Sequence, residues 1–265
     1  MKQQFFNTNL LINSSNSTSD NVVELFKQPS IEEYNSLALL YKDKNLNNKV
    51  IDTYKKSLQL IVETYGEEHI KTVNAYLKLA EAYIEENESD KALMLYKNIL
   101  EINKKLYSFK SVENAVVFSA LANIYFENNQ LEEALDYYLK ALELRKELLG
   151  DFHPLTAKSY HELGFFYAAS EEFELALPLF EKSLEVRVEL YRGTHPQTAI
   201  SYNSLALCCY NLFDYERAYK YMREAVRIKK MILPTDDESL LTCQANLKEI
   251  KKHLPKSNFI KRFFR

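Results

Sequence analysis

Hydrophobic residues follow a pattern with a period of 42 residues, and five copies of this pattern succeed one another without an insertion. Within a copy these residues stand three or four positions apart, which is the spacing of one face of an α-helix. The spacing is interrupted midway through each copy, near positions 45, 87, 129, 171 and 213, and then resumes. The pattern therefore predicts that each copy is a hairpin of two amphipathic helices.

A leucine followed by a small residue marks the first helix of every copy, at positions 37–38, 79–80, 121–122, 163–164 and 205–206. An aromatic residue precedes each leucine by three positions, and a tyrosine follows it by four, except that Cys209 takes this place in the last copy. The second helix carries alanine or valine at 50, 92, 134, 176 and 218, followed four residues later by Tyr54, Tyr96, Tyr138, Phe180 and Met222. We expect the small residues to let the two helices approach closely and the large ones to fill the space beside them.

The junctions between copies carry residues that end and begin helices. Glycine stands at positions 66, 150 and 193, and proline follows at 154 and 196, which is the usual order at a helix end and the next helix start. His69, His153 and His195 occupy equivalent junction positions. Stacked repeats would hold them at least one repeat apart, whereas zinc ligands converge within about 2.1 Å of the ion. We therefore expect these histidines to cap the junctions, and we predict no metal site.

This pattern resembles the tetratricopeptide repeat (TPR), in the 42-residue form of kinesin light chains. The likeness rests on the Leu-Ala or Leu-Gly pair, on the aromatic residues around it, and on junctions such as Leu-Gly-Asp-Phe-His-Pro at 149–154. It implies an all-α fold, a right-handed α-solenoid of five TPR helical hairpins plus a C-terminal capping helix. The resemblance places this solenoid at 31–252, with repeats at 31–72, 73–114, 115–156, 157–198 and 199–240 and the cap at 241–252.

The segments outside the repeats differ from them in composition. Residues 1–30 are rich in Asn, Ser and Thr and are expected to be largely disordered, apart from a short helix at 21–26 that would cover the first repeat. They show no sustained heptads, so the N-terminal coiled coil of a kinesin light chain is not expected. Residues 253–265 form a basic, aromatic tail. This tail either has no role, or the segment 251–265 supports weak self-association by docking into a groove or contacts a membrane surface.

Composition and charge narrow the function further. Four glycines in 265 residues leave no glycine-rich loop for a phosphate, and a net charge of −3 gives no general attraction to nucleic acid. Cys208, Cys209 and Cys243 suggest neither a disulfide framework nor a metal-binding pair, and are expected to be packing residues in a reducing compartment. We recognise no signal peptide, membrane span or catalytic motif. The sequence predicts a cytoplasmic protein that is not an enzyme and uses no cofactor.

In the TPR family, residues of each first helix outside the packing signature line a concave groove that binds peptides. The corresponding positions here are Asn35, Leu39, Asn74, Leu77, Glu81, Ile84, Glu85, Ser119, Asn123, Phe126, Lys158, His161, Phe165, Asn203, Leu207 and Tyr210. The first repeats contribute acidic residues and the later ones apolar residues, which predicts a groove that is acidic at one end and apolar at the other. The alternative is that the N-terminal segment or neighbouring repeats cover several of the apolar residues.

The predicted function is a non-catalytic adaptor or scaffold that holds a peptide segment of a partner protein and favours basic residues beside bulky apolar ones. The alternative is a TPR-type regulatory sensor that changes its superhelical pitch on binding a signalling peptide, as in bacterial quorum-sensing receptors with similar repeats. Those receptors join the repeats to an effector domain, which an N-terminal segment of 30 residues is not expected to supply. His161 lies on the groove side of a first helix and is expected to add a modest pH dependence near neutrality.

Overall fold

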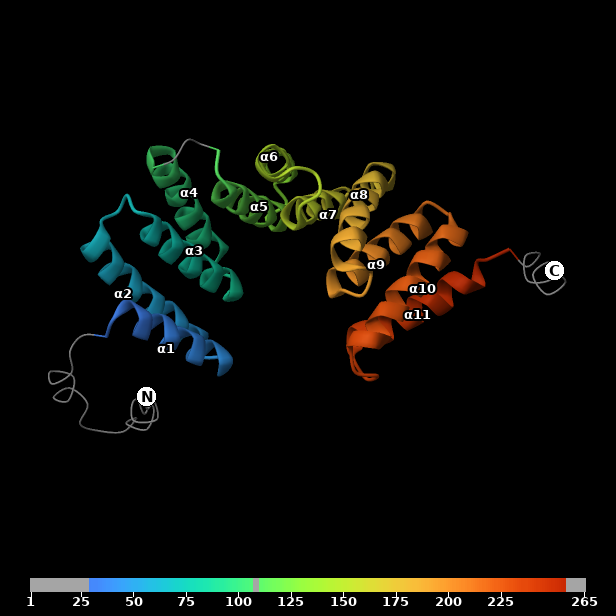
Figure 1. Cartoon of the computed structure of the whole chain (residues 1–265), viewed down its shortest axis with the longest axis horizontal. Coiled ribbons are helices and arrows are strands. Elements are labelled where there is room, and N and C mark those ends of the chain that lie inside the picture. The colour runs from blue at the N-terminus through green and yellow to red at the C-terminus, as the bar shows by residue number, and fades with distance from the viewer. Residues whose placement is uncertain (1–28, 107–109, 256–265) are drawn as a thin grey trace. The chain divides into compact units, whose positions relative to one another are not determined.

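The computed structural model describes residues 29–106 and 110–255, and these residues form helices joined by short turns, without a β-strand (Figure 1). The helices are α1 (Ile31–Asp43), α2 (Asn47–Tyr65), α3 (Ile70–Glu85), α4 (Ser89–Leu106), α5 (Val112–Glu127), α6 (Leu131–Leu149), α7 (Pro154–Ala169), α8 (Phe173–Tyr191), α9 (Pro196–Asn211), α10 (Tyr215–Ile232) and α11 (Glu238–Lys252). The expected helix at 21–26, the expected disorder near the N-terminus and the aromatic part of the tail concern residues outside the described ranges.

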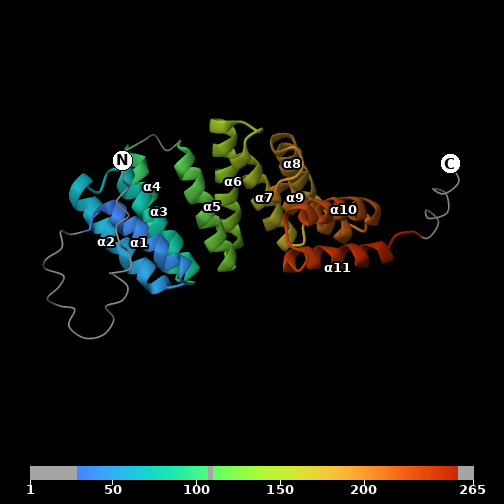
Figure 2. The same cartoon turned by 60° about the horizontal axis from the view of Figure 1, so that its bottom comes forward.

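The helices pair as the repeats predict. The two helices of a repeat pack against each other in α1 and α2, α5 and α6, α7 and α8, and α9 and α10, and the second helices α2, α6, α8 and α10 also pack against the next first helix. At the C-terminal end, α10 and α11 lie along each other in both views (Figures 1 and 2). The all-α fold of five helical hairpins and a capping helix is therefore confirmed.

Each hairpin turns through a residue in the left-handed backbone region. These residues lie 42 positions apart, at the predicted interruptions, and have φ angles of 54°, 59°, 59°, 62° and 61° at Asn45, Asn87, Asn129, Glu171 and Phe213. Asparagine adopts this region more readily than other residues with a Cβ atom. The first three turns therefore have a suitable residue, whereas glutamate and phenylalanine adopt the same conformation at a cost.

The junction histidines begin helices, as predicted. The Nδ1 atoms of His69, His153 and His195 accept hydrogen bonds of 3.1, 3.2 and 3.2 Å from the backbone N–H two residues ahead. Such a bond satisfies a donor that the first turn of a helix leaves unpaired. The capping role is therefore confirmed at α3, α7 and α9.

Glycine directly follows two of the second helices, as predicted. At the third predicted junction, after α8, another residue directly follows the helix. Gly66 and Gly150 follow α2 and α6 with φ angles of 87° and 80°, which favour glycine. After α8, the left-handed position next to the helix is Arg192, with a φ of 50°, and Gly193 comes one residue later with a φ of 77°. This junction therefore uses two consecutive left-handed residues.

The chain divides after Leu95 into two compact units, which we call unit 1 and unit 2 and describe separately. In both units the small residues of the first helices are buried; Ala38, Ala80, Ala122 and Ala206 are each 0% exposed. Gly164 takes this place in the fourth repeat, where a Cβ atom would lie 2.9 Å from Cδ1 and Cε1 of Phe180. The predicted close approach of the two helices is therefore confirmed at this hairpin.

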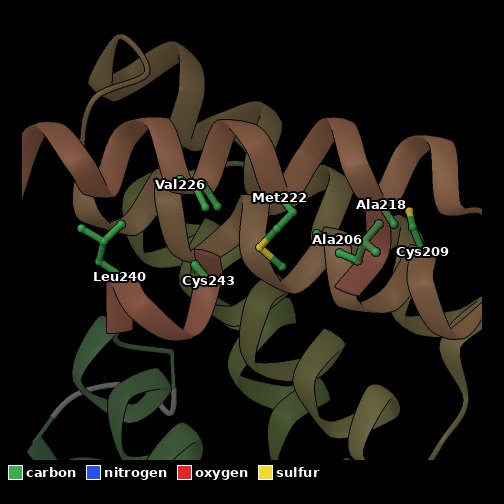
Figure 3. Packing of buried hydrophobic residues seen from close by; sticks show 9 residues of the cluster. Ala206, Cys209, Ala218, Met222, Val226, Leu240 and Cys243 are labelled. Atoms are coloured by element: carbon green, nitrogen blue, oxygen red, sulfur yellow. The ribbon is translucent and has the colours of Figure 1, made fainter. Parts of the chain in front are cut away.

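A buried cluster joins the last three helices of unit 2. It contains Ala206 and Cys209 from α9, Ala218, Met222 and Val226 from α10, and Leu240 and Cys243 from α11 (Figure 3). All three cysteines are buried free thiols. Burial raises the pKa of Cys208 to about 12 and that of Cys209 to about 11, so both thiols stay protonated at neutral pH. Their predicted packing role is confirmed.

The outer side of α11 is polar, as a capping helix requires. Lys248, which replaces the small residue of the repeat, is exposed, and so are Glu249, Lys251 and Lys252. Exposed charges on the last helix keep a repeat array from offering a bare apolar end. Within the described ranges, no helix is both long and apolar enough to cross a lipid bilayer.

Candidate functional site

The residues predicted to bind a peptide lie on first helices, and the unit boundary divides them into two sets. In unit 1, α1 and α3 carry Asn35, Leu39, Asn74, Leu77, Glu81, Ile84 and Glu85. In unit 2, α5, α7 and α9 carry Ser119, Asn123, Phe126, Lys158, His161, Phe165, Asn203, Leu207 and Tyr210. In unit 2, α7 contacts both α5 and α9. We call the exposed surfaces of these helices the first-helix face of unit 1 and the first-helix face of unit 2.

On the first-helix face of unit 1, an ion pair neutralises part of the predicted acidic end. Lys42 Nζ lies 2.6 Å from Glu85 Oε1, and this hydrogen bond raises the pKa of Lys42. Glu81 and Asn74 are exposed, and Leu39 is 58% exposed. Of the two carboxylates predicted to line this face, Glu85 is therefore held in an ion pair, whereas Glu81 is exposed.

Hydrogen bonds tie consecutive first helices together between residues 43 positions apart. In unit 1 they join Lys42 to Glu85 (2.6 Å) and Lys78 to Asn35 (3.2 Å). In unit 2 they join Ser119 to Glu162 (2.9 Å) and His161 to Ser204 (3.0 Å). With the same spacing, Tyr210 of α9 is joined to His253 (3.3 Å), the residue that follows the capping helix α11. Several residues predicted to contact a peptide therefore already hold neighbouring helices together.

Glu162 is the centre of a polar network in unit 2. Its carboxylate accepts a hydrogen bond from Ser119, lies 3.5 Å from Nη1 of Arg145 and lies 3.5 Å from Nζ of Lys158. The side chain of Arg145 is only 1% exposed, and its Nη1 also donates to Ser159 Oγ at 2.5 Å. Burial lowers the pKa of Arg145, whereas the neighbouring carboxylate opposes this shift. Ser119 is buried in this network, so it holds the face together and is not available to a ligand.

A second buried arginine occupies the equivalent position one repeat later. Arg187 Nη1 donates to Ser201 Oγ at 2.7 Å and to the Gln197 carbonyl oxygen at 3.1 Å. Burial lowers its pKa to about 10, so the side chain is still charged at neutral pH. Each arginine fixes a second helix to the next first helix, because Arg145 bonds to α7 and Arg187 bonds to α9.

The expectation that His161 titrates near neutrality is wrong. Its ring lies 5.3 Å from that of Phe180, and its Nε2 atom lies 3.0 Å from Ser204 Oγ. Burial first, and then the charge of Arg187, lower its pKa to about 4. Both effects disfavour the imidazolium, so His161 is neutral at physiological pH and contributes only hydrogen-bonding groups.

Apolar side chains from three helices remain available on the first-helix face of unit 2. Phe165 of α7 is 52% exposed and Leu207 of α9 is 38% exposed. Phe126 of α5 is half-buried, and its ring packs edge-on against Phe165 with centroids 6.2 Å apart. Tyr210 is also half-buried. Phe165 is therefore the most prominent apolar group among the predicted residues of this face.

Three of the four asparagines predicted to line the groove use their carbonyl oxygens within the protein. The Oδ1 atom of Asn123 accepts from the Tyr138 hydroxyl at 2.5 Å, that of Asn203 lies 3.2 Å from Cys243 Sγ, and that of Asn35 accepts from Lys78. These bonds orient the side-chain amides, so the Nδ2 group of each is the part that can donate a hydrogen bond to a ligand.

Comparison with known families decides the classification. A sequence profile of the tetratricopeptide repeat matches residues 33–105, 113–164 and 157–231, which together make up most of the chain. The chain belongs to the tetratricopeptide repeat family. Proteins with these repeats bind other proteins or peptides as a rule, and this chain shares their helical hairpins and packing residues. A comparison with curated protein sequences found no significant match.

Several solved structures have the same fold. BtubC (BKLC) from P. vanneervenii has a TM-score of 0.68 and 20% identity, over 78% of this chain and 84% of that one. The kinesin light chain TPR-like repeats of Podosopora anserina have a TM-score of 0.63 and 20% identity, over 77% of this TPR chain and 97% of that one. Aspartyl phosphate phosphatase F from Bacillus subtilis has a TM-score of 0.69 and 16% identity, over 86% of this chain and 56% of that one. At this level of identity the likeness concerns the fold.

The two buried arginines were not among the predicted residues, although the repeat contains the signal for them. Arg145 and Arg187 stand 42 residues apart, and so do their partners Ser159 and Ser201. A charged residue that recurs with the repeat beside the hydrophobic positions indicates a buried polar contact between helices. A comparison of the polar positions of successive repeats, like that of the hydrophobic ones, predicts both arginine–serine pairs.

Proposed function

We propose that this TPR protein is a non-catalytic adaptor that binds a peptide segment of a partner protein on the first-helix face of unit 2. The observation that carries the proposal is Phe165, a large aromatic side chain that is half exposed beside Phe126 in the middle of three adjacent first helices. Membership of a family whose members bind proteins supports it.

The apolar anchor of the peptide would pack between Phe165 and Leu207. Burying a large apolar side chain contributes about 1.5–3 kcal/mol, and aromatic residues dominate many protein interfaces. The face is already rigid, because hydrogen bonds join α5 to α7 and α7 to α9. A rigid face avoids part of the entropy loss that accompanies binding.

Polar groups around the anchor would hold the peptide backbone and select its charge. The Nδ2 group of Asn123 can donate to a peptide carbonyl oxygen. Glu127 is exposed and directly follows Phe126, so a basic residue beside the anchor would meet a carboxylate there. Lys158 lies next to Glu162, which offsets its charge. We therefore retain the preference for a bulky apolar residue next to a basic one.

A peptide selected from a random-sequence library on the immobilised protein tests this proposal. Phe165→Ala should weaken the selected peptide by about 1–3 kcal/mol, or roughly 5- to 150-fold in Kd, with unchanged helicity. Phe152→Ala is the matched control, because Phe152 is also 52% exposed but lies in the turn between α6 and α7. Equal affinities of the two variants would place the binding site elsewhere.

The same titration separates an adaptor from a peptide-responsive sensor. An adaptor with a preformed face keeps its radius of gyration when it binds the peptide, whereas a sensor that changes its pitch alters that radius. Small-angle scattering of the free and saturated protein measures this difference. If the radius of gyration changes and Phe165→Ala also weakens binding, the peptide binds at the proposed site and the protein is a sensor rather than an adaptor.

A further inference from the structure

The outer sides of α8 and α10, away from the first-helix face, border a cleft with an apolar floor. The cleft has a volume of about 460 Å³ and is lined by Glu181, Leu184, Glu185, Val188, Glu189 and Tyr221. The two helices are directly linked, because Arg217 Nη1, near the start of α10, lies 3.3 Å from Glu181 Oε1 in the middle of α8. None of these residues belongs to the proposed peptide-binding site.

Charges on the two helices are reversed position by position. On α8, Glu181, Lys182 and Glu185 carry negative, positive and negative charge, and their side chains are 44%, 57% and 51% exposed. On α10, the residues 42 positions later are Arg223, Glu224 and Arg227, which carry positive, negative and positive charge. Glu224 and Arg227 are 32% and 50% exposed at their side chains, and Arg223 is exposed.

This reversal does not occur between α6 and α8. On α6, the residues 42 positions before Lys182, Glu185 and Glu189 are Lys140, Glu143 and Glu147, so the signs there are the same as on α8. The repeat itself therefore does not require the reversal. Nearer the start of α8 and α10, Glu174 and Glu216 also have the same sign, so the reversed stretch lies in the middle of the helices.

We propose that this surface binds the same surface of a second copy of the chain. A two-fold axis between α8 and α10, directed along the bisector of the two helices, places α8 of one copy against α10 of the other and keeps positions along the helices in register. Glu181 then faces Arg223, Lys182 faces Glu224, and Glu185 faces Arg227 of the other copy. Such an interface is isologous, so it closes at a dimer.

An apolar contact accompanies the charges in this arrangement. Lys230 and Met231 stand 42 positions after Val188 and Glu189, so in the same register the two pairs lie side by side at the end of the cleft. Met231, which is 63% exposed, can then contact Val188 of the other copy, and Lys230 can pair with Glu189. The ion pairs now within each helix, Lys182 with Glu185 at 3.0 Å and Arg227 with Glu224 at 2.7 Å, are exposed. Exposed pairs contribute little and exchange partners readily. We expect a weak dimer that dissociates as salt is added.

A second copy fits this surface better than an anionic membrane or an acidic protein does. Those ligands would be attracted by Arg223 and Arg227, but Glu181, Glu185 and Glu189 on the adjacent helix would repel them. A second copy presents the basic residues of its α10 to the acidic residues of α8, and the acidic residues of its α8 to the basic residues of α10. Because the first-helix faces are not used, each copy in the dimer retains its peptide-binding surface.

Sedimentation velocity on two complementary variants tests the proposal. E181R/E185R makes α8 basic, and R223E/R227E makes α10 acidic, so each variant alone meets like charge in the dimer. We expect the wild-type chain to form dimers at low salt and each variant to be monomeric. An equimolar mixture of the two variants should form a heterodimer, because opposite charges face each other again at both contacts.

The matched control is E143R/E147R, which makes the same kind of change on α6 and should dimerise like the wild-type chain. Circular dichroism verifies that every variant is folded, which the exposure of the altered residues leads us to expect. A monomeric wild-type chain at high concentration, dimerisation of either variant alone, or a mixture that stays monomeric would each overturn the proposal. Binding of the wild-type chain to phosphatidylserine vesicles that R223E/R227E abolishes, without dimerisation, would assign the basic residues to a membrane instead.

Discussion

Replacing Gly164 with alanine tests how closely the two helices of the fourth repeat pack. Gly164 is the one position of the Leu-small pair that is not alanine in this chain, and an added Cβ would lie 2.9 Å from the ring of Phe180 and 3.3 Å from Cβ of Leu179. Phe180 is only 2% exposed, so its ring has no solvent to move into. The added methyl group therefore has to displace a helix or a buried ring.

The net effect combines a gain and a larger loss. Alanine is favoured over glycine in a helix by about 1 kcal/mol, whereas overpacking a core costs typically ~1–3 kcal/mol. We expect G164A to lower the free energy of unfolding by about 1 kcal/mol, which lowers the Tm by about 2–4 °C in a protein of this size. On helix propensity alone, the substitution would stabilise the protein.

A second substitution identifies the cause. The next repeat has Ala206 and Met222 at the equivalent positions, and both are fully buried. Adding F180M to G164A recreates this pair and should recover most of the lost stability. In a double-mutant cycle measured by urea denaturation, we expect a coupling of about 1–2 kcal/mol. Additive effects of the two substitutions, or a rise in stability from G164A alone, would show that the contact between Gly164 and Phe180 is not tight.

Three further predictions concern the folded state. The folded pKa of His161, about 4, lies below the unfolded value of about 6.5, so its contribution to stability is complete above pH 6.5 and is lost as the pH falls toward 4. This contribution is on the order of 3 kcal/mol, and H161Q should flatten the pH dependence of urea denaturation over that range. Phe213 is left-handed and 77% exposed, so F213N should raise the free energy of unfolding by about 1 kcal/mol. Ala134 is 0% exposed, so A134W should cost ~1–3 kcal/mol or more in a thermal melt; a neutral effect would contradict tight packing there.

The fold was predictable because the repeat applies the same local rules five times. The Leu-small pair and the large residue of the second helix fixed the pairing of helices, and the left-handed turns fall at the predicted interruptions. The junction histidines were also predictable, since each precedes a helix start by one residue. The use of Arg192 in front of Gly193 was not, because it depends on where the last turn of α8 ends.

The candidate site was less predictable, because contacts between repeats decide which residues are available. Sequence position places Ser119 and Phe165 alike on a first helix, yet Ser119 is buried against Glu162 whereas Phe165 is half exposed. The pKa of His161 depends on Phe180 and Arg187, which belong to another helix. Such properties arise from distances between helices, and the residue pattern of one helix does not contain them.

Hydrogen–deuterium exchange of the free and peptide-bound protein tests the central claim most directly. We expect the selected peptide to protect amides in α5, α7 and α9, with the largest effect around Phe165, and to leave α8 and α10 unchanged. The fraction of the protein in the dimer proposed on α8 and α10 is kept constant by working at one protein concentration and one salt concentration. Protection confined to α8 and α10, or no protection of α7 at saturating peptide, would contradict binding on the first-helix face.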